Sequence, residues 1–436
     1  MAKKMSKNVS MITFGCKLNQ AETQAMADKL NCIGYNITFD EKNGKNDIYV
    51  INTCTVTSEA ERKIRQLIRR IKRKNNDVKV IAVGCYVHTD AEKLKDIGAD
   101  LVLGNLEKKF IDKYINDSGV ILNKSYWLKN QDKIITPEKS FDDRTRIFIP
   151  IEEGCLNACS YCRIIFSRGT SIRSLPINKV LKAISNYIDL GYKELVLTGI
   201  NLNQFGFDNS ETLTELLEKI EENFGEDDIR IRLTSMYPEY VDKKMVEIIF
   251  NSKIFEKHVH LSIQHFSNKI LNLMGRKYDK NKIIEAIKLF RERDKFFSIT
   301  SDIIVGFPYE EDEDFQELLN SIKDMKILKV HGFRFSARPG TKASKMENQV
   351  LGNIKKDRIE TLNLNSKNIS EDYRKELIGK EVTILSEKID DNYIYGYDEY
   401  YIHHKCDFKN INPVKNKFYR VKIQDISDEG VSSYVL

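Results

Sequence analysis

The alternation of apolar and polar segments predicts an α/β fold for the first quarter of the chain. Short apolar runs that read as buried strands lie at 8–15, 47–53, 78–84 and 99–104. A helix is expected after the first strand, with Asn19 as its N-cap, and further helices are expected at 58–74, capped by Ser58, and at 89–97. This βαβαβαβ series predicts a mostly parallel, doubly wound sheet.

A second alternation of strands and helices begins at residue 145, after a polar stretch at 119–144 that is predicted as a linker. Strands are expected at 145–151, 194–199, 229–235, 258–264, 298–306 and 327–335. The helices between them are expected at 177–190, 211–223, 241–250, 281–293 and 312–324. Six β/α units predict a partial TIM-like (β/α)6 barrel, with its chemistry at the carboxyl ends of the strands.

From about residue 376 the pattern changes to short β-rich runs, at 381–387, 392–405 and 418–427. These runs predict a small closed β-barrel. Its tyrosines and lysines are suited to base stacking and backbone contact with RNA, although tyrosines that only pack a small β core fit the pattern equally well. The expected domains are therefore 1–118, 145–375 and 376–436, with the linker between the first two.

Composition adds only broad limits. The 436 residues are 41% hydrophobic and 31% charged, as in ordinary globular proteins. No run reaches the roughly 18 apolar residues of a membrane helix, the first residues lack the apolar core of a signal peptide, and the eight cysteines form no disulfide framework. We expect a monomeric cytoplasmic protein that does not associate with membranes. The net charge of +6 is modest, so nucleic-acid binding would depend on local patches.

Three cysteines directly follow the first strand of the central region. Cys155, Cys159 and Cys162 have the spacing Cys-x3-Cys-x2-Cys. Thiolates are soft ligands for iron–sulfur clusters or zinc, and three of them can hold a 4Fe–4S cube with its fourth iron open. The alternatives are a helix in which the cysteines pack as small apolar residues, and a zinc knuckle, which needs a fourth ligand that the next residues lack. The preceding Gly154 favours a loop.

Three more cysteines occupy equivalent positions in the N-terminal region. Cys16, Cys54 and Cys85 each come directly after a predicted strand. Because the carboxyl ends of parallel strands meet at one edge of a sheet, we expect these thiols to converge on one site, with apolar packing at strand ends as the alternative. Cys32 is expected in a helix as part of the core, and Cys406 is expected to be structural.

The predicted helix 58–74 is strongly basic. Its cations are Arg62, Lys63, Arg65, Arg69, Arg70, Lys72, Arg73 and Lys74. Charge runs are most often solvated helix faces. Here nearly all the charge has one sign, which favours a face that contacts phosphates.

These motifs resemble a known family. The three-cysteine loop, with Tyr161 before its last cysteine, resembles the radical S-adenosylmethionine (SAM) superfamily. Glu153-Gly154, Ser167-Arg168-Gly169 and Arg173-Ser174 resemble its methylthiotransferases, as do "GCKLNQ" at 15–20, "NTCTVT" at 52–57 and "VGC" at 83–85. The resemblance implies two 4Fe–4S clusters, a radical-generating one on Cys155, Cys159 and Cys162 and an auxiliary one on Cys16, Cys54 and Cys85. It also implies that the C-terminal barrel is an RNA-binding TRAM domain.

The resemblance further implies a reaction and its partners. Cleavage of SAM gives a 5′-deoxyadenosyl radical that removes hydrogen from carbon 2 of an adenine, the auxiliary cluster presents sulfur, and a second SAM supplies the methyl group. The motifs at 15–20 and 52–57 are most similar to the branch acting on N6-threonylcarbamoyladenosine 37 of tRNA. Expected partners are the tRNA anticodon stem-loop, an electron donor such as a flavodoxin or ferredoxin, and a sulfur source. The alternatives are isopentenyladenosine 37, a ribosomal-protein aspartate, or a non-enzymatic zinc or RNA-binding protein.

Individual contacts follow from the same resemblance. Cofactor contacts are expected from Tyr161, Thr198, Gly199, Asn201, Ser235, Gln264 and Gly306. RNA contacts are expected from Arg62, Arg65, Arg69, Arg70, Arg73, Tyr397 and Lys405. The chain departs from the family at Ile165-Phe166, where a proline is usual, and at His265-Phe266, where Ser-Gly is usual, so the local shape of the pocket is expected to differ there.

Overall fold

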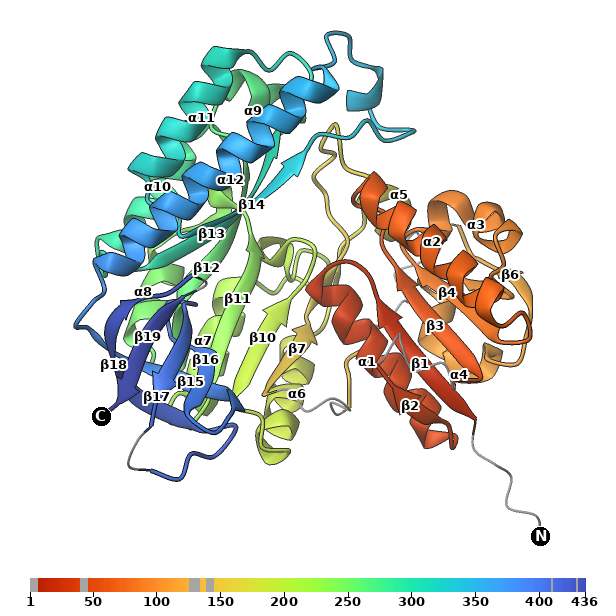
Figure 1. The fold of residues 1–436 in the computed structure, drawn as a ribbon, viewed down its shortest axis with the longest axis horizontal. Helices are drawn as coiled ribbons and strands as arrows, with labels where there is room; N and C mark the ends of the chain where they lie inside the picture. The colour runs from red at the N-terminus through yellow and green to blue at the C-terminus, as the bar shows by residue number, and fades with distance from the viewer. Residues whose placement is uncertain (1–6, 40–45, 125–133, 139–144, 409–410, 429) are drawn as a thin grey trace.

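The computed structural model describes residues 7–39, 46–124, 134–138, 145–408, 411–428 and 430–436 of the chain (Figure 1). Three β-structures follow one another: two six-stranded parallel sheets and a closed five-stranded barrel. The predicted fold class is confirmed. In the part of the chain that is described, no helix is both long and apolar enough to cross a membrane.

The N-terminal sheet has the strand order β2-β1-β3-β4-β5-β6, and all neighbouring strands are parallel. Its strands are β1 Asn8–Thr13, β2 Asn36–Thr38, β3 Ile48–Thr53, β4 Lys79–Gly84, β5 Leu101–Leu103 and β6 Gly119–Ile121. The helices are α1 Lys17–Cys32, α2 Ser58–Lys74, α3 Val87–Asp96, the 3-10 helix η1 Glu107–Phe110 and α4 Ile111–Tyr114. Separate apolar clusters cover the two faces, one including Ile64 and Ile68 of α2 and the other Met26 and Leu30 of α1, so the sheet is doubly wound as predicted.

Several local predictions for this region were wrong. The N-cap of α1 is Cys16, and Asn19 is buried inside the helix. The N-cap of α2 is Thr57, whose side chain accepts a hydrogen bond from the backbone of Ala60, and not Ser58. Cys32 ends α1 in an exposed position and is not part of the core.

The stretch predicted as a linker begins with a strand. β6 pairs with β5 and completes the N-terminal sheet. Residues 125–133 and 139–144 of the same stretch lie outside the described residues. Neither β2 nor β6 was predicted, because their three residues are only partly buried or exposed, whereas the three residues of the predicted strand β5 are apolar and buried.

The central sheet has the order β14-β13-β12-β11-β10-β7, again with parallel neighbours. Its strands are β7 Arg146–Pro150, β10 Glu194–Thr198, β11 Arg230–Met236, β12 Phe255–Gln264, β13 Ser298–Val305 and β14 Lys329–Arg334. The longer helices are α6 Ile177–Asp189, α7 Leu213–Phe224, α8 Lys243–Asn251, α9 Asn268–Met274, α10 Lys280–Arg291, α11 Asp312–Asp324 and α12 Gly352–Lys375. Short elements complete the region: hairpin β8 Glu152–Glu153 and β9 Arg173–Ser174, helix α5 Ile164–Arg168, and 3-10 helices η3 Leu202–Gln204, η4 Pro238–Tyr240 and η5 Ala343–Lys345.

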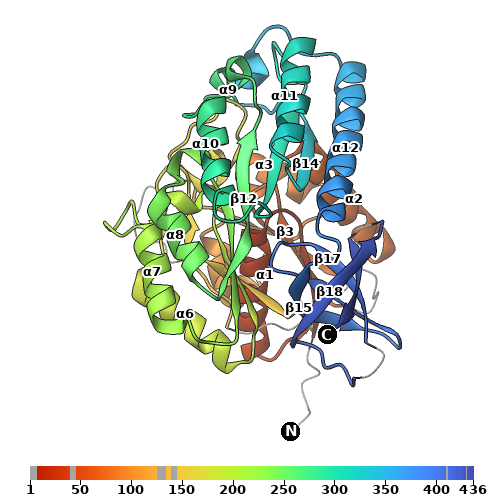
Figure 2. The same cartoon turned by 90° about the vertical axis from the view of Figure 1, so that its left-hand side faces the viewer.

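The central sheet is an open, partial barrel, as the six predicted β/α units required. Figure 2 shows α6, α7, α8 and α10 along its outer side. Alternate strand residues, such as Ile147, Leu195 and Ile231, point outward into the core that these helices cover. The helices α9 and α12 and the β8–β9 hairpin were not predicted.

The C-terminal region is a closed barrel with the order β15-β16-β17-β19-β18. Its strands are β15 Glu381–Ile389, β16 Tyr393–Tyr397, β17 His403–Asp407, β18 Phe418–Ile426 and β19 Val431–Val435. The run predicted at 392–405 is therefore two strands, and β19 was missed. Cys406 is buried in the barrel core, as expected. Guanidinium groups of the central sheet join the barrel: Arg230 donates to Tyr397 O (2.9 Å) and Arg232 to Asp398 O (2.7 Å).

Candidate active site

The three N-terminal cysteines lie together at the carboxyl edge of their sheet. They follow β1, β3 and β4, which are adjacent strands, with Thr13 opposite Asn52 and Thr53 opposite Gly84. A side chain at Gly15 would reach to 3.1 Å from the Cys54 sulfur, so the loop before Cys16 is in contact with Cys54. The topology thus produces the predicted convergence of these loops.

Burial favours the neutral form of the Cys54 thiol in this site. Cys54 and Cys85 are buried, whereas Cys16 is exposed. Burial raises the pKa of Cys54 to about 12, with Cys85 and Cys16 adding to the effect. Thiolates packed this closely would repel one another, and a metal cluster would remove that penalty.

The central cysteines lie in a loop between β8 and α5, so the helical alternative is wrong. The backbone amide of Asn157 donates to the Cys155 sulfur (3.4 Å), and Arg276 Nη1 donates to the Cys159 sulfur (3.3 Å). Burial raises the pKa of Cys155 to about 11. Donors aimed at sulfur stabilise thiolates, so the loop suits a cluster that carries negative charge.

Among the described residues, no three or more His, Cys, Asp and Glu side chains gather in the way that a single metal ion requires. Each set consists of three cysteines, which are the usual ligands of iron–sulfur clusters. In a 4Fe–4S cube each thiolate binds a different iron atom. Three neighbouring thiols that do not converge on a single point can therefore hold such a cube. A mononuclear zinc site fits less well.

The predicted SAM contacts at the second strand have the features of a ligand site. Glu152 Oε2 accepts hydrogen bonds from the backbone amides of Ile200 and Asn201, both at 2.8 Å. A side chain at Gly199 would lie 2.6 Å from that oxygen and would displace the Glu152 carboxylate from these amides. The Asn201 side chain is buried, and neither its Oδ1 nor its Nδ2 has a hydrogen-bond partner. Such an amide is available to a ligand.

Three other predicted cofactor residues, Ser235, Gln264 and Gly306, also lie at or next to strand ends. Ser235 (φ 55°) and Gln264 (φ 69°) adopt left-handed backbone conformations, which non-glycine residues hold mainly where the surroundings enforce them. Gly306 follows β13 with φ 70°. The ring of Tyr161 packs edge-on against Phe307 at 6.2 Å, which joins the cysteine loop to the end of β13. Their roles toward SAM stay predictions.

Arg276, which follows the left-handed Gly275 at the end of α9, belongs to no motif and was not predicted as a site residue. Its guanidinium donates to Ser262 O (2.6 Å) as well as to Cys159, and it stacks 4.3 Å from the ring of Tyr237. Burial would lower its pKa, but Tyr278 and its other neighbours outweigh that effect and raise the pKa well above the usual value. Arg276 is therefore a permanent cation against the cysteine loop.

A buried ionic network joins the two cysteine regions. Arg168, 1% exposed, donates to Glu22, to Glu153 and to the side-chain oxygen of Asn19, each at 2.8 Å. Lys108 pairs with Glu22 at 2.6 Å. The Asn19 amide in turn donates to Phe14 O and Thr53 O, which precede two of the N-terminal cysteines. Sequence reasoning placed Arg168 in a family motif but could not identify these partners.

A second network links residues that directly follow a cysteine in each set. Glu61 of α2 accepts from Thr55 (2.6 Å), next to Cys54, and from Arg163 (3.1 Å), next to Cys162. Arg338, beyond β14, also bonds to Glu61. The two sites are thus held in a fixed relation by charged contacts.

The departures at Ile165-Phe166 and His265-Phe266 have structural roles. His265 and Phe266 are fully buried, and His265 Nδ1 accepts from the amide of Ser267 (3.0 Å). Phe166 packs near Gly340.

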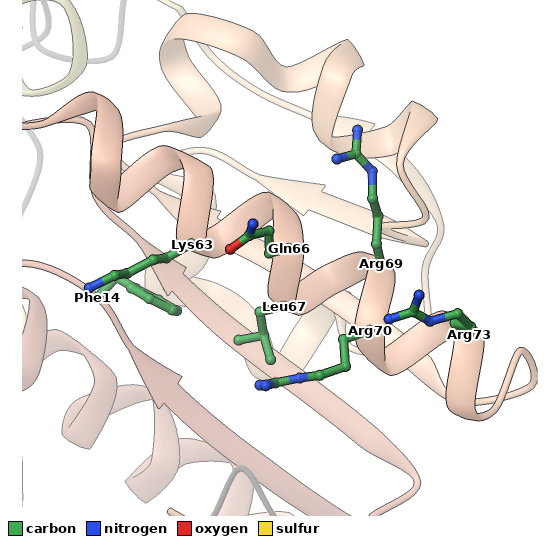
Figure 3. A pocket seen from close by; sticks show the side chains of 7 residues that line it. All are labelled: Phe14, Lys63, Gln66, Leu67, Arg69, Arg70 and Arg73. Atoms are coloured by element: carbon green, nitrogen blue, oxygen red, sulfur yellow. The ribbon is translucent and has the colours of Figure 1, made fainter.

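The basic helix α2 forms a pocket of about 750 Å³ on its exposed side (Figure 3). It is lined by Phe14, Lys63, Gln66, Leu67, Arg69, Arg70 and Arg73. Two of the predicted arginines are engaged elsewhere: Arg62 pairs with Glu59 (2.6 Å), and Arg65 donates to the Tyr86 hydroxyl (2.7 Å). The other three predicted arginines, Arg69, Arg70 and Arg73, line the pocket.

The predicted RNA residues of the barrel lie on another cleft or near it. Tyr397 stacks on Tyr401 at 4.8 Å, and both line a cleft of about 320 Å³ between the barrel, β14 and α12. Lys405 lies over the ring of Tyr393 at 4.0 Å. Neither α2 nor the barrel is shown to bind RNA, so these contacts stay predictions.

Comparison with known proteins defines the class of the molecule. Residues 149–322 match the radical SAM superfamily, and residues 8–104 match the uncharacterized protein family UPF0004. The solved structure of the radical SAM methyltransferase TsrM from Kitasatospora setae, with cobalamin and a [4Fe-4S] cluster bound, superposes with a TM-score of 0.57 over 78% of this chain and 77% of that one. At 15% identity this likeness shows the fold alone. The class is a radical SAM enzyme.

Two curated relatives identify the family. A threonylcarbamoyladenosine tRNA methylthiotransferase, MtaB, from Thermotoga maritima is 38% identical, over 98% of this chain and 96% of its own length. A tRNA-2-methylthio-N(6)-dimethylallyladenosine synthase from Thermodesulfovibrio yellowstonii is 35% identical, over 87% of this chain and 88% of its own length. The chain belongs to the radical SAM methylthiotransferase family.

Proposed function

We propose that the protein adds a methylthio group to carbon 2 of N6-threonylcarbamoyladenosine at position 37 of tRNA. The observation that carries the proposal is the pair of three-cysteine sets at the carboxyl ends of two parallel sheets, joined by the networks around Arg168 and Glu61. The substrate follows the Thermotoga relative, which matches nearly the whole chain.

Carbon 2 of adenine carries an unactivated C–H bond that acid–base side chains cannot break, so cofactors must supply the difficult step. Cys155, Cys159 and Cys162 would hold one 4Fe–4S cluster, and Cys16, Cys54 and Cys85 the other. When bound, these clusters and two SAM molecules per turnover supply the electron, the radical, the sulfur and the methyl group.

The remaining residues of the site position these groups. Arg276 and the amide of Asn157 would stabilise the thiolates of the central loop. Glu152 holds the turn that begins at Gly199, and Asn201 offers an unpaired amide for SAM. Arg168 holds the N-terminal cysteine loops against the central region through Asn19.

The partners belong to the same proposal. The anticodon stem-loop of tRNA would contact the basic pocket of α2 and the C-terminal barrel, which would act as a TRAM domain. A flavodoxin or ferredoxin would supply electrons, and a separate source would supply sulfur. The protein would act as a cytoplasmic monomer.

Isopentenyladenosine 37 is the competing substrate, because the dimethylallyladenosine synthase relative is nearly as similar. The test is an assay of the reconstituted protein with SAM and dithionite on stem-loops that carry either nucleoside, read by nucleoside mass spectrometry. The proposal expects methylthiolation of the threonylcarbamoyl nucleoside only. Methylthiolation of the isopentenyl nucleoside only would contradict it. Metal analysis excludes the zinc-protein alternative if it finds about eight irons per chain.

A further inference from the structure

The central sheet presents polar residues on the face opposite its helices. The residues between the outward apolar positions include Arg146, Glu194, Arg232, His260 and Asp302. TIM barrels usually fill this space with branched apolar side chains. A polar interior costs free energy unless its groups are paired with one another or with a ligand.

At the amino end of the strands these groups satisfy one another. Glu194 pairs with Arg230 (2.5 Å) and Arg232 (3.1 Å), and Arg232 also pairs with Glu256 (3.1 Å). Arg146 bonds to Glu387 of the C-terminal barrel. This layer closes the bottom of the interior and offers little to a ligand.

The layer above it is different. His260 Nε2 lies 3.5 Å from Asp302 Oδ2, and its Nδ1 is hydrogen-bonded to Thr300 (3.0 Å). The ring of His331 on the edge strand β14 lies 5.8 Å from that of His260. The side chain of Asp302 is 35% exposed, so this cluster faces open space and not packed core.

Lys17 brings a cation to the same cluster from the other sheet. It begins α1, directly after Cys16, and α1 packs against β7 at the edge of the central sheet. Burial lowers the pKa of its ammonium group, and the charges of Asp302, Arg146 and Arg232, on three different strands of the interior, also act on it, with Asp302 favouring the cation. No carboxylate of a described residue lies within 4.0 Å of its ammonium group.

The cluster also lies at the right height in the barrel. Lys17 adjoins a cysteine of the N-terminal set, and Asp302 lies three residues before the end of β13, whose next residue is Gly306. The end of β13 contacts the central cysteine loop, because the ring of Phe307 packs against that of Tyr161. An adenine that reacts between the two iron–sulfur clusters would therefore place its substituent near this cluster.

We propose that Lys17, with His260 and Asp302, forms a pocket for an N6 substituent of the target adenine that carries a carboxylate together with hydroxyl or N–H donors. Lys17 pairs with the carboxylate, and Asp302 accepts from the donors. The inference rests on the proposed function, and it assigns that function's choice of substrate to named residues.

The proposed pocket selects between substrates because a substituent without polar groups leaves the pocket's own polar side chains without partners. A site built to hydrogen-bond a substrate rejects an analogue that lacks the polar groups, because its own buried groups then lose water without gaining partners. An isopentenyl substituent would leave Lys17 and Asp302 in that condition. A threonylcarbamoyl substituent satisfies both.

The test is the affinity of the reconstituted full-length protein for labelled anticodon stem-loops, measured by fluorescence anisotropy without reductant, so that no turnover occurs. The stem-loops carry unmodified adenosine, threonylcarbamoyladenosine or isopentenyladenosine at position 37. The variants are Lys17→Met, Lys17→Arg and Asp302→Asn, with Lys179→Met on the exposed face of α6 as the matched control.

We expect the wild type to bind the threonylcarbamoyl RNA at least about tenfold more tightly than the unmodified RNA. Lys17→Met and Asp302→Asn should remove that preference without changing the affinity for unmodified RNA, whereas Lys17→Arg and Lys179→Met should retain it. Circular dichroism and iron content check folding, and Asp302→Asn decides the matter if Lys17→Met does not fold.

Two other results would contradict the pocket, and they differ in what they say about the proposed function. If the wild type prefers the threonylcarbamoyl RNA and the variants keep that preference, or lose affinity for all RNAs equally, the pocket is refuted while the proposed function stands. If the wild type prefers the isopentenyl RNA, the proposed substrate is wrong and the pocket falls with it.

Discussion

The two parallel sheets assemble similar sets of cysteines in different ways. In the N-terminal sheet, Cys16, Cys54 and Cys85 are far apart in sequence and meet only because β1, β3 and β4 are neighbours. In the central region, Cys155, Cys159 and Cys162 lie in one loop. The first site therefore depends on the whole sheet and on the contacts that hold it, whereas the second depends mainly on a local loop.

The two cysteine sites also differ in the buried glutamate that lies beside each of them. Burial would raise the pKa of Glu22, but Arg168 and Lys108 outweigh it and hold the pKa below its usual value. Burial raises the pKa of Glu152, beside the central loop, to about 8, because the backbone amides of Asn201 and Ile200 and the charge of Arg173 oppose it only in part. At neutral pH, Glu22 is therefore charged and links two domains, whereas Glu152 is mostly protonated and supports a turn.

The largest expected effects separate the two sets. Cys159→Ala should abolish 5′-deoxyadenosine formation from SAM, whereas Cys54→Ala should retain it and lose only the methylthio product, because each removes one cluster. Each variant should keep about four of about eight irons. Chromatography of SAM products and iron analysis check both. Normal deoxyadenosine release from Cys159→Ala would contradict the assignment.

The next effect tests the joint between the sheets. Arg168→Met leaves Glu22 and Glu153 buried without their shared partner, and it should lower the free energy of unfolding by about 3–5 kcal/mol. Urea titration measures the change. The control, Lys253→Met, removes an exposed pair with Glu226 and should cost less than about 1 kcal/mol. Equal effects would show that Arg168 does not hold the joint.

The two glutamates should respond oppositely to pH. Because the folded pKa of Glu152, about 8, exceeds its ordinary value of 4.5, its protonated form stabilises the fold below pH 4.5, and that contribution is lost as the pH rises toward 8. Within this window, the free energy of unfolding of Glu152→Gln should fall less steeply with pH than that of the wild type, by up to about 1.4 kcal/mol per pH unit. Urea titrations at several pH values measure the slope.

Glu22 supplies the contrasting case. Since its folded pKa is lowered, its contribution is present above its ordinary value of 4.5 and is lost as the pH falls. Glu22→Gln should therefore destabilise the protein at neutral pH and matter less in acid. Parallel pH dependences for Glu152→Gln and Glu22→Gln would refute the contrast.

The smallest effect concerns RNA. Arg69→Met in the α2 pocket should weaken stem-loop binding a few-fold, equally for all nucleosides at position 37, and reduce the slope of log affinity against log salt by about 1. Titrations at several salt concentrations measure it, with Lys179→Met as the control. An unchanged slope would remove α2 from the RNA interface.

The long elements could be predicted because their apolar patterns are strong. Every strand of the central sheet was found, whereas β2, β6 and the β8–β9 hairpin are short and, unlike the equally short β5, have no buried apolar run. Helix α12 was missed because few of its residues are buried. The caps at Asn19 and Ser58 were wrong because cap preference is local, whereas Asn19 is fixed by distant partners.

The cysteine sets could also be predicted, one from spacing and the other from position at strand ends. The groups around them could not. Arg168 meets Asn19 across 149 residues, and Arg276 meets Cys159 across 117. No periodicity or motif spacing records such pairings. The first arises only when the two sheets pack together, and the second only when the end of α9 contacts the cysteine loop of the central region.

The measurement that tests the central claim most directly is nucleoside mass spectrometry of tRNA from a strain lacking this gene, from its parent and from the strain complemented with the gene. We predict that 2-methylthio-N6-threonylcarbamoyladenosine is lost, that its precursor accumulates, and that complementation restores it whereas the Cys159→Ala gene does not. Persistence of that nucleoside in the deletion strain would contradict the account.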